Sequence, residues 1–264
     1  MLEIQNLHKT FNKGTINEKV ALAGVNLTLL PGDFVTIIGG NGAGKSTTLN
    51  AIAGVWDVDE GKIIVDGADI TRLSEHKRAR YLGRVFQDPM TGTAATMSIE
   101  ENMAIAARRG DRRGFRWGIT KKEREYYKEH LKMLDLGLED RLSTKVGLLS
   151  GGQRQAVTLL MAALKKPKLL LLDEHTAALD PKTAAKVLEI SDKIIAENHL
   201  TAMMVTHNMK DAIAHGNRLI MMNEGKIIYD VSGDEKKKLH VSDLLAKFEE
   251  ASGTEFANDR MMLS

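Results

Sequence analysis

The chain has 264 residues, of which 43% are hydrophobic and 27% are charged, and its formal net charge is +2. These values are typical of a soluble globular protein with a full core, and the charge gives no reason to expect a nucleic-acid partner. The absence of cysteine excludes disulfides, zinc–thiolate clusters and thiol catalysis. Apolar runs such as residues 169–172 are far shorter than the ~20 residues of a membrane helix, and no signal-peptide pattern follows Met1. We therefore expect a cytosolic protein, with any membrane role peripheral.

The first third of the chain reads as strands that lead into a glycine-rich loop. Residues 2–11 and 20–30 have strand-like patterns, and a Pro-Gly turn closes the second. Residues 34–38 form a β-branched run typical of a buried central strand. Residues 45–53 contain no helix breaker, so the sequence predicts strand, glycine loop and helix in that order.

The glycine loop fits the phosphate-binding pattern G-x-x-x-x-G-K-[ST]. Its residues are Gly39, Gly40, Asn41, Gly42, Ala43, Gly44, Lys45, Ser46 and Thr47. Backbone N–H groups at a helix N-terminus surround phosphate oxygens best where no side chain intervenes, which explains the glycines. We expect Lys45 to reach the β- and γ-phosphates of a nucleotide and Ser46 to bind Mg²⁺.

The middle of the chain changes character. Residues 61–67 and 82–87 look like further strands, whereas residues 90–148 show helical spacing and many charges. We interpret this region as a helical subdomain inserted into the nucleotide-binding core. A second helical face, at residues 156–164, follows a Ser-Gly-Gly turn and ends at two lysines and a proline.

That Ser-Gly-Gly turn belongs to a second candidate anion-binding segment, termed the signature segment below. Its residues are Leu149, Ser150, Gly151, Gly152 and Gln153. Adjacent glycines allow backbone N–H groups to approach an anion, the serine hydroxyl adds a donor, and the following helix directs its positive end the same way. The alternative is a Ser/Gly helix start that binds no ligand.

Two carboxylates follow the apolar run at residues 169–172. Asp173 is expected to act through water on a metal ion, and Glu174 to polarise the attacking water as a general base. A strand capped by solvated acids is the alternative interpretation. Downstream, Asp180 and Pro181 are typical of a helix N-terminus. A strand at 203–206, a hairpin around 223–225 and an amphipathic segment beginning at Val241 complete the pattern.

Taken in order, these motifs resemble the ATP-binding cassette (ABC) family over about residues 1–233. The resemblance implies an α/β fold: a P-loop NTPase (RecA-like) core, an antiparallel β subdomain and an α-helical subdomain inserted at about residues 90–154. Residues 234–264 would form a C-terminal helical tail. In this family the nucleotide lies between the phosphate loop of one subunit and the signature segment of another. The resemblance therefore implies a head-to-tail dimer, and one chain with both halves intact allows a homodimer.

The same resemblance assigns four further residues. Gln87 matches the glutamine that contacts Mg²⁺ and senses the γ-phosphate, and His207 matches the histidine that contacts the γ-phosphate and orients the general base. Asp180 matches the dimer-communication loop, although it also suits a helix cap. Phe11 matches the aromatic residue that stacks on adenine, where the usual residue is tyrosine; a core position is the alternative.

Two features depart from the family pattern or fall outside it. His175 stands where many relatives have proline, and it either titrates near neutral pH or caps a loop. Residues 108–128 are rich in Arg and Lys and contain Trp117. This stretch is either a solvated helical face or a contact with lipid headgroups or a membrane partner.

The leading hypothesis is an ATPase subunit that uses ATP and Mg²⁺ to drive a separate transmembrane permease. It would lie on the cytoplasmic face of the membrane, contact the permease through residues 91–102, and act with an extracytoplasmic substrate-binding protein. Details near residues 10–18 and 172–181 resemble a poorly characterised bacterial importer subgroup suspected to take up amino acids, including aromatic ones. The alternative is a soluble ABC ATPase that serves cofactor or complex assembly. A non-catalytic binding module would require a damaged site, which this sequence lacks.

Overall fold

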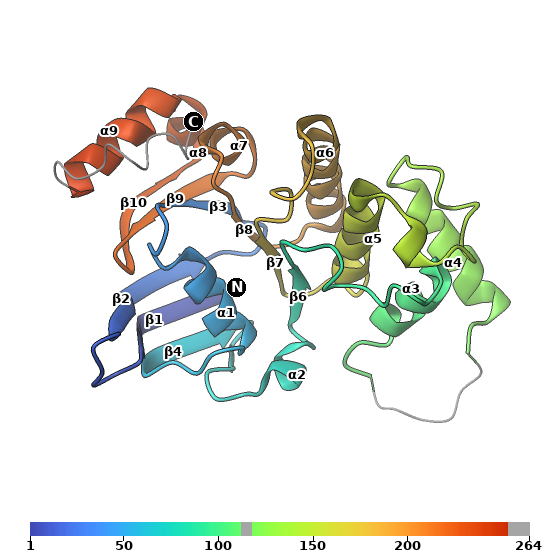
Figure 1. The fold of residues 1–264 in the computed structure, drawn as a ribbon, viewed down its shortest axis with the longest axis horizontal. Coiled ribbons are helices and arrows are strands. Elements are labelled where there is room, and N and C mark those ends of the chain that lie inside the picture. The colour runs from blue at the N-terminus through green and yellow to red at the C-terminus, as the bar shows by residue number, and fades with distance from the viewer. Residues whose placement is uncertain (112–117, 253–264) are drawn as a thin grey trace.

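The computed structural model describes residues 1–111 and 118–252, with two sheets and a set of helices around them (Figure 1). The strands are β1 (Leu2–Phe11), β2 (Lys19–Leu29), β3 (Phe34–Ile38), β4 (Glu60–Val65), β5 (Ala68–Asp69), β6 (Leu82–Val85), β7 (Leu169–Asp173), β8 (Ala202–Val205), β9 (Arg218–Asn223) and β10 (Lys226–Ser232). The helices are α1 (Lys45–Ala53), α2 (Glu75–Arg78), α3 (Ile99–Ala107), α4 (Lys121–Lys132), the 3-10 turn η1 (Val146–Leu148), α5 (Gly151–Ala163), α6 (Pro181–Asn198), α7 (Met209–Ala214), α8 (Gly233–Lys237) and α9 (Val241–Ser252).

The larger sheet has the strand order β10-β9-β3-β8-β7-β6. Its strands run parallel except for β10, which pairs antiparallel with β9 through the expected hairpin. β3 is buried along its whole length, as a central strand covered on both faces should be. The smaller sheet, β2-β1-β4-β5, is antiparallel. This arrangement confirms the predicted α/β class with a separate antiparallel unit.

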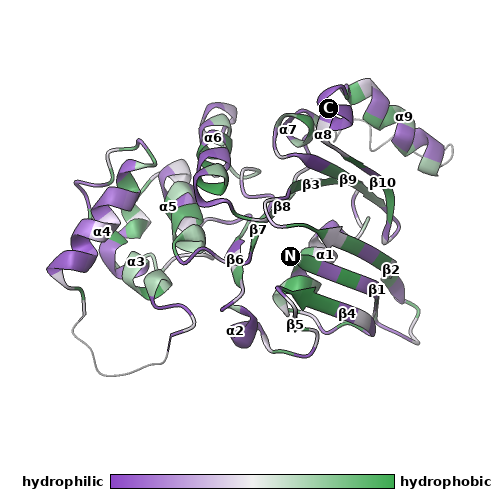
Figure 2. Cartoon of the chain, turned by 180° about the vertical axis from the view of Figure 1, so that it is seen from behind, coloured by the Kyte–Doolittle hydropathy of each residue, from purple (hydrophilic) through white to green (hydrophobic). Residues whose placement is uncertain are grey.

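Alternate residues of the parallel strands feed two different cores, because side chains alternate across a sheet. Leu169 and Leu171 of β7 join a cluster with α1 and the antiparallel sheet, whereas Leu170 and Leu172 join one with α3, α4, α5 and α6. Figure 2 shows the resulting pattern, with hydrophobic residues concentrated on β2, β4 and β9 and hydrophilic ones on the outer helix α4.

The helices α3 and α4 lie beyond α5, on the side away from the antiparallel sheet (Figure 1). Ser98 and Thr120 form capping boxes at the starts of α3 and α4, which fixes where each helix begins. The boundaries of the helical subdomain, expected at about residues 90–154, remain a prediction. The placement of α3 and α4 beyond α5 is consistent with it.

The segment after β10 packs back on the core. A third cluster joins Leu244 and Phe248 of α9 to Met209 of α7 and Ile38 of β3. Buried Lys236 of α8 donates hydrogen bonds to the backbone carbonyls of His215 and Gly216. Burial lowers the pKa of Lys236 to about 8. The amphipathic pattern predicted after residue 233 is thus the face that covers α7.

Some expected strand ends differ from the observed ones. β6 ends at Val85 and β4 at Val65, each two residues earlier than the sequence pattern indicated. Asp66 has a φ of 51° and Gly67 a φ of 80°, so a turn replaces the strand there. Within residues 1–111 and 118–252, no helix is both long and apolar enough to cross a bilayer.

Candidate nucleotide-binding and catalytic site

The phosphate loop connects β3 to α1, and two of its glycines are required by close backbone contacts. A Cβ at Gly39 would lie 2.4 Å from the carbonyl oxygen of Met222, and one at Gly44 would lie 2.7 Å from that of Ala21. Gly44 also has a φ of 103°, a region that favours glycine. The loop is therefore wrapped tightly against β9 and β2, with α1 beginning directly after it.

Lys45 is folded into this loop. Its side chain is buried, and Nζ donates to the carbonyl oxygens of Gly39 at 2.7 Å and Gly40 at 3.1 Å. Beside it, Ser46 Oγ donates to Asp173 Oδ1 across 3.4 Å. The structure thus brings the phosphate loop and the acidic strand end together, as the sequence predicted.

Asp173 is the last residue of β7 and is held between two partners. Its Oδ1 faces Ser46, and its Oδ2 lies 3.4 Å from Nη2 of Arg84 on the neighbouring strand β6. Burial raises the pKa of Asp173, and the positive charge of Arg84 opposes that rise. The carboxylate is therefore held in a site where a nearby cation favours its ionised form.

Glu174 follows Asp173 and pairs with His207. Its backbone has a φ of 46°, a conformation that few non-glycine residues adopt and that clusters at functional sites. Oε1 lies 2.6 Å from Nε2 of His207, and the Glu174 side chain is 12% exposed against 39% for His207. Burial would raise the pKa of Glu174, but the hydrogen bond and charge of His207, together with Lys45, outweigh it and lower that pKa.

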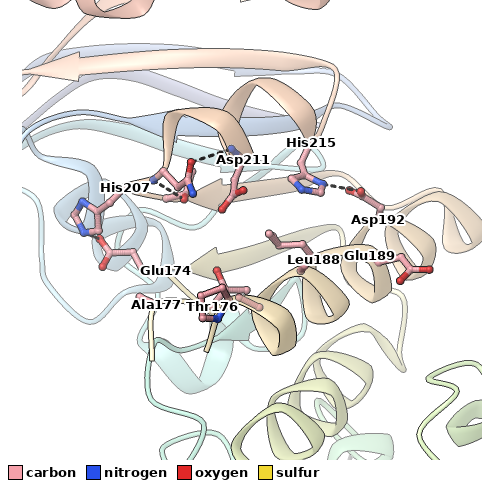
Figure 3. A pocket seen from close by; sticks show the side chains of 14 residues that line it. Glu174, Thr176, Ala177, Leu188, Glu189, Asp192, His207, Asp211 and His215 are labelled. Carbon is pink, nitrogen blue, oxygen red and sulfur yellow. Dashed lines mark hydrogen bonds and ion pairs between the residues drawn. The ribbon is translucent and has the colours of Figure 1, made fainter. Parts of the chain in front are cut away.

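This pair lies at one end of a groove between α6 and α7 with a volume of about 560 Å³. Figure 3 shows Glu174 and His207 at that end and the paired His215 and Asp192 at the other. The groove gives solvent access to the carboxylate beside the phosphate loop. An ionised carboxylate at such a position is able to accept a proton from water.

Oxygen donors at the loop fit a magnesium ion. Mg²⁺ on a phosphate chain prefers a few protein oxygens and keeps its remaining ligands as phosphate and water. Ser46 Oγ and Asp173 Oδ1 converge at 3.4 Å, which matches this requirement. The described residues hold no cluster of three His, Asp or Glu side chains suited to a metal, and a site of this kind does not need one.

The remaining predicted residues lie near this centre or on other surfaces. Gln87 is exposed and lies two residues beyond the end of β6. Phe11 ends β1, and its ring meets Trp56 edge-on at a centroid distance of 4.8 Å, with Lys9 Nζ 5.4 Å from its centroid. Phe11 is partly exposed rather than a core residue.

The signature segment begins α5 and is built as a helix start. Ser150 Oγ accepts from the backbone N–H of Gln153, and Gln153 Oε1 accepts from the backbone N–H of Ser150. A Cβ at Gly151 would contact Leu179, and one at Gly152 would lie only 2.1 Å from Thr183 Cγ2 of α6. These glycines thus face the start of α6 in the same subunit.

Asp180 caps that neighbouring helix. Its Oδ1 accepts from the backbone N–H of Thr183, and the hydrogen bonds with Thr183 lower the pKa of Asp180. The capping prediction is confirmed. The N-termini of α5 and α6 therefore lie side by side, and the signature segment and Asp180 sit on the same edge of the molecule.

His175 has neither role expected from the sequence. It is fully buried, and its Nε2 lies 2.9 Å from Ser191 Oγ of α6. Burial lowers its pKa to about 4, so the side chain is neutral at physiological pH. It is a hydrogen-bonded core residue.

Sequence reasoning missed three polar residues that tie the site together. Arg84 joins Asp173 to Asn50 of α1, with Nη2 2.6 Å from Asn50 Oδ1. Gln155 of α5 is buried and donates from Nε2 to the carbonyl oxygen of Phe86 at 3.1 Å. The available signal was polarity: Arg84 and Gln155 are long polar side chains at positions where the strand and helix patterns call for an apolar one.

The structure describes part of the basic stretch at residues 108–128. Arg108 pairs with Glu123, and Arg124 with Glu100. Residues 112–117, which include Trp117 and three of the arginines, lie outside the described residues. The lipid-contact hypothesis is therefore untested.

Comparison with known proteins shows the family of the chain. A family model described as ABC transporter matches residues 22–177. The chain is 44% identical to a tyrosine transport ATP-binding protein of Clostridioides difficile over 95% of its own length and all of that protein. It is 32% identical to the phosphonates import ATP-binding protein PhnC of Alcaligenes faecalis, over 87% of the chain and 82% of that protein.

Solved structures agree with this match. A dimeric ATP-binding cassette in a post-hydrolysis state, bound to ADP and Pi, superposes with a TM-score of 0.74 at 31% identity, covering 88% of this chain and 98% of that one. The phosphate loop, the acidic strand end and the signature segment thus occur in a fold shared with known cassettes. The chain belongs to the ABC transporter family, and it is an ATP-hydrolysing cassette of that family.

Proposed function

We propose that Glu174 is the general base of ATP hydrolysis in this chain and that His207 orients it. The observation that carries this assignment is the 2.6 Å contact between them, made at the edge of a groove beside the phosphate loop. The carboxylate is ionised at neutral pH because its pKa is lowered, so it accepts a proton from the attacking water. Lys45 binds the β- and γ-phosphates together with the loop backbone.

Ser46 and Asp173 would hold the magnesium ion that accompanies ATP, with Gln87 nearby in sequence beyond β6. When bound, the ion neutralises charge on the phosphate chain. Phe11 stacks on the adenine ring through its exposed face. These assignments follow the family pattern and agree with the way β3, β6, β7 and β8 end at one edge of the parallel sheet.

The working unit is a dimer of two copies of this chain. Gly151 and Gly152 of the signature segment face the start of α6 in their own subunit, and in the family pattern a second subunit supplies this segment to the nucleotide. A dimeric cassette is among the similar solved structures, which supports this arrangement. Both halves of a composite site are present in one chain, and two identical subunits would form two such sites.

The transported substrate is an amino acid, and tyrosine is the leading candidate. Support comes from the 44% identity to a tyrosine transport ATP-binding protein over its whole length, while other relatives are import ATP-binding proteins for spermidine and putrescine, phosphonates or methionine. The direction proposed is import. The cassette would sit on the cytoplasmic face of the membrane against a permease, with an extracytoplasmic binding protein that selects the cargo.

Uptake by intact cells tests this proposal. Deletion of the chain should abolish uptake of labelled tyrosine, and the wild-type chain should restore it, whereas Glu174→Gln should not. Gentle solubilisation of native membranes with a tagged chain should recover a multi-spanning permease. Recovery of soluble partners alone, with normal uptake, would favour the assembly-type ATPase instead.

A further inference from the structure

Arg84 occupies an unusual position for an arginine. It lies in the middle of β6, its side chain is only 14% exposed, and it makes the sole ion pair of Asp173 among those found in the described residues. Its guanidinium carbon lies 4.6 Å from the centroid of the Phe86 ring. A buried charge of this kind is costly unless neighbouring groups compensate it.

Two contacts fix the guanidinium independently of Asp173. Nη2 donates to Asn50 Oδ1 at 2.6 Å, and the plane of the group is held near the ring of Phe86, a contact that arginine makes better than lysine. The bond to Asp173 is longer, at 3.4 Å. Asn50 and Phe86 therefore anchor Arg84, and Arg84 in turn acts on Asp173.

Two other donor atoms of the Arg84 guanidinium make no hydrogen bond within the described residues. Its Nε and Nη1 atoms are buried, and among the described residues they have no hydrogen-bond partner. A residue selected only for packing would not be expected to leave two buried donors unpaired, because each costs free energy. The position is better explained by the charge that it places beside Asp173.

The two carboxylate oxygens of Asp173 are divided between two neighbours. Oδ2 faces Arg84, and Oδ1 faces Ser46, each at 3.4 Å. Rotation of the carboxylate away from Ser46 would give up the interaction with Arg84. The guanidinium thus restrains the direction in which Oδ1 points.

We propose that Arg84 is a positioning residue of the hydrolytic site, which holds one oxygen of Asp173 so that the other stays directed at the metal position beside Ser46. The proposal rests on the proposed function of Ser46 and Asp173. Because Asn50 belongs to α1, the same guanidinium also ties the helix of the phosphate loop to β7. Residues that orient a metal-binding carboxylate typically change metal affinity by about 10- to 100-fold when removed.

Metal binding without turnover tests the proposal. The full-length Glu174→Gln variant is loaded with ATP and freed of excess nucleotide, and Mn²⁺ is titrated as a paramagnetic substitute for Mg²⁺ while the free ion is followed by electron paramagnetic resonance. Adding Arg84→Met should weaken Mn²⁺ binding by about tenfold or more. ATP binding in EDTA should change less than about twofold, because Arg84 acts on the metal ligand.

The matched control is Arg80→Met, which removes an exposed arginine from the same region and should leave the Mn²⁺ affinity unchanged. Arg84→Lys keeps the charge without the planar group and should fall between wild type and Arg84→Met. If Arg84→Met does not fold, Asn50→Leu removes the anchor and should weaken Mn²⁺ binding in the same direction.

Two results would overturn the proposal. One is an Mn²⁺ affinity of Arg84→Met equal to that of the Arg80→Met control. The other is an equal loss of ATP binding with and without metal, which indicates a purely structural role. If the Glu174→Gln variant fails to retain ATP, the proposed function of Glu174 fails separately, and the same Mn²⁺ comparison is made with a non-hydrolysable ATP analogue in the wild-type background.

Discussion

The carboxylate of Glu174 and the imidazole of His207 meet at 2.6 Å, although they come from segments that follow different strands, β7 and β8. These strands are parallel neighbours, with Asp173 opposite Val205 in the register. Their carboxyl ends therefore deliver both side chains to one edge of the sheet. This pairing places an ionised carboxylate and a polar ring at the edge of the sheet where the phosphate loop follows β3.

Replacing Glu174 with glutamine should stop hydrolysis and spare binding. The amide keeps the shape of the side chain but cannot accept a proton, so kcat should fall by about 10²- to 10⁴-fold. Phosphate release and binding of a fluorescent ATP analogue measure the two effects. Glu189→Gln, which alters another carboxylate of the same groove, should retain near-normal turnover. Near-normal turnover of Glu174→Gln itself would show that the base is a different group.

Replacing Lys45 with alanine should weaken nucleotide binding. The ammonium group supplies a positive charge for the phosphates, and charge-assisted hydrogen bonds are worth about 1.5–3 kcal/mol each. We expect an ATP affinity at least about tenfold weaker by equilibrium binding. Lys182→Ala removes an exposed charge at the start of α6 and serves as the control. An unchanged affinity in Lys45→Ala would place the phosphates elsewhere.

His175 should make the folded state sensitive to mild acid. The unfolded chain takes up a proton near the ordinary value of 6.5, whereas the folded chain does so only near pH 4, because the pKa of His175 is lowered to about 4. The free energy of unfolding should therefore fall as pH drops from about 6.5 towards 4, by up to about 3 kcal/mol. His175→Gln removes this component.

Urea denaturation of both proteins at about pH 7 and about pH 5 measures the difference. The wild type should lose more stability than His175→Gln over this interval, and the other histidines cancel because both proteins contain them. Identical losses would mean that the imidazole is accessible to protons in the folded state.

Gly152 has a packing role against Thr183 and a proposed role in ATP binding across a dimer, and the two can be separated by mutation. Gly152→Ala places a methyl group 2.1 Å from Thr183 Cγ2 and should destabilise the chain by about 1–3 kcal/mol through overpacking. Thr183→Ser removes that methyl carbon, so the double variant should regain most of the lost stability, as measured by thermal unfolding. If the signature segment binds ATP across a dimer, the double variant should still hydrolyse ATP poorly. Full recovery of both properties would assign Gly152 to helix packing alone.

The sequence predicted the sheet, the phosphate loop and the acidic strand end because their signals are local. Val35 and Ile37 indicate a buried strand. The glycines that follow fit a phosphate-binding pattern whose spacing can be recognised in the sequence alone. The contact of Glu174 with His207 also follows from parallel strand order. By contrast, the pairing of Arg84 with Asn50 and Asp173 joins three separate elements. Such contacts depend on three-dimensional register, which spacing along one chain does not encode.

His175 illustrates the opposite failure. Its neighbours in sequence, Glu174 and Thr176, are polar, and Glu174 is a proposed catalytic residue, so local context favoured an exposed or titrating side chain. The structure buries it because α6 packs over this turn and Ser191 supplies a hydrogen-bond partner sixteen residues away. Its burial was therefore decided by the helix that follows Asp180, not by the motif to which it belongs.

The last helix of the described chain, α9, lies near His207 only through α7. α7 begins two residues after that histidine, and its inner side is shared between β3 and α9, while Lys236 binds the carbonyls at its far end. A segment near the end of the described chain thus packs against the helix that begins two residues after His207, the residue proposed to orient the general base. Displacement of α9 should therefore expose one side of α7 and disturb the position of His207, without any direct contact with the phosphate loop.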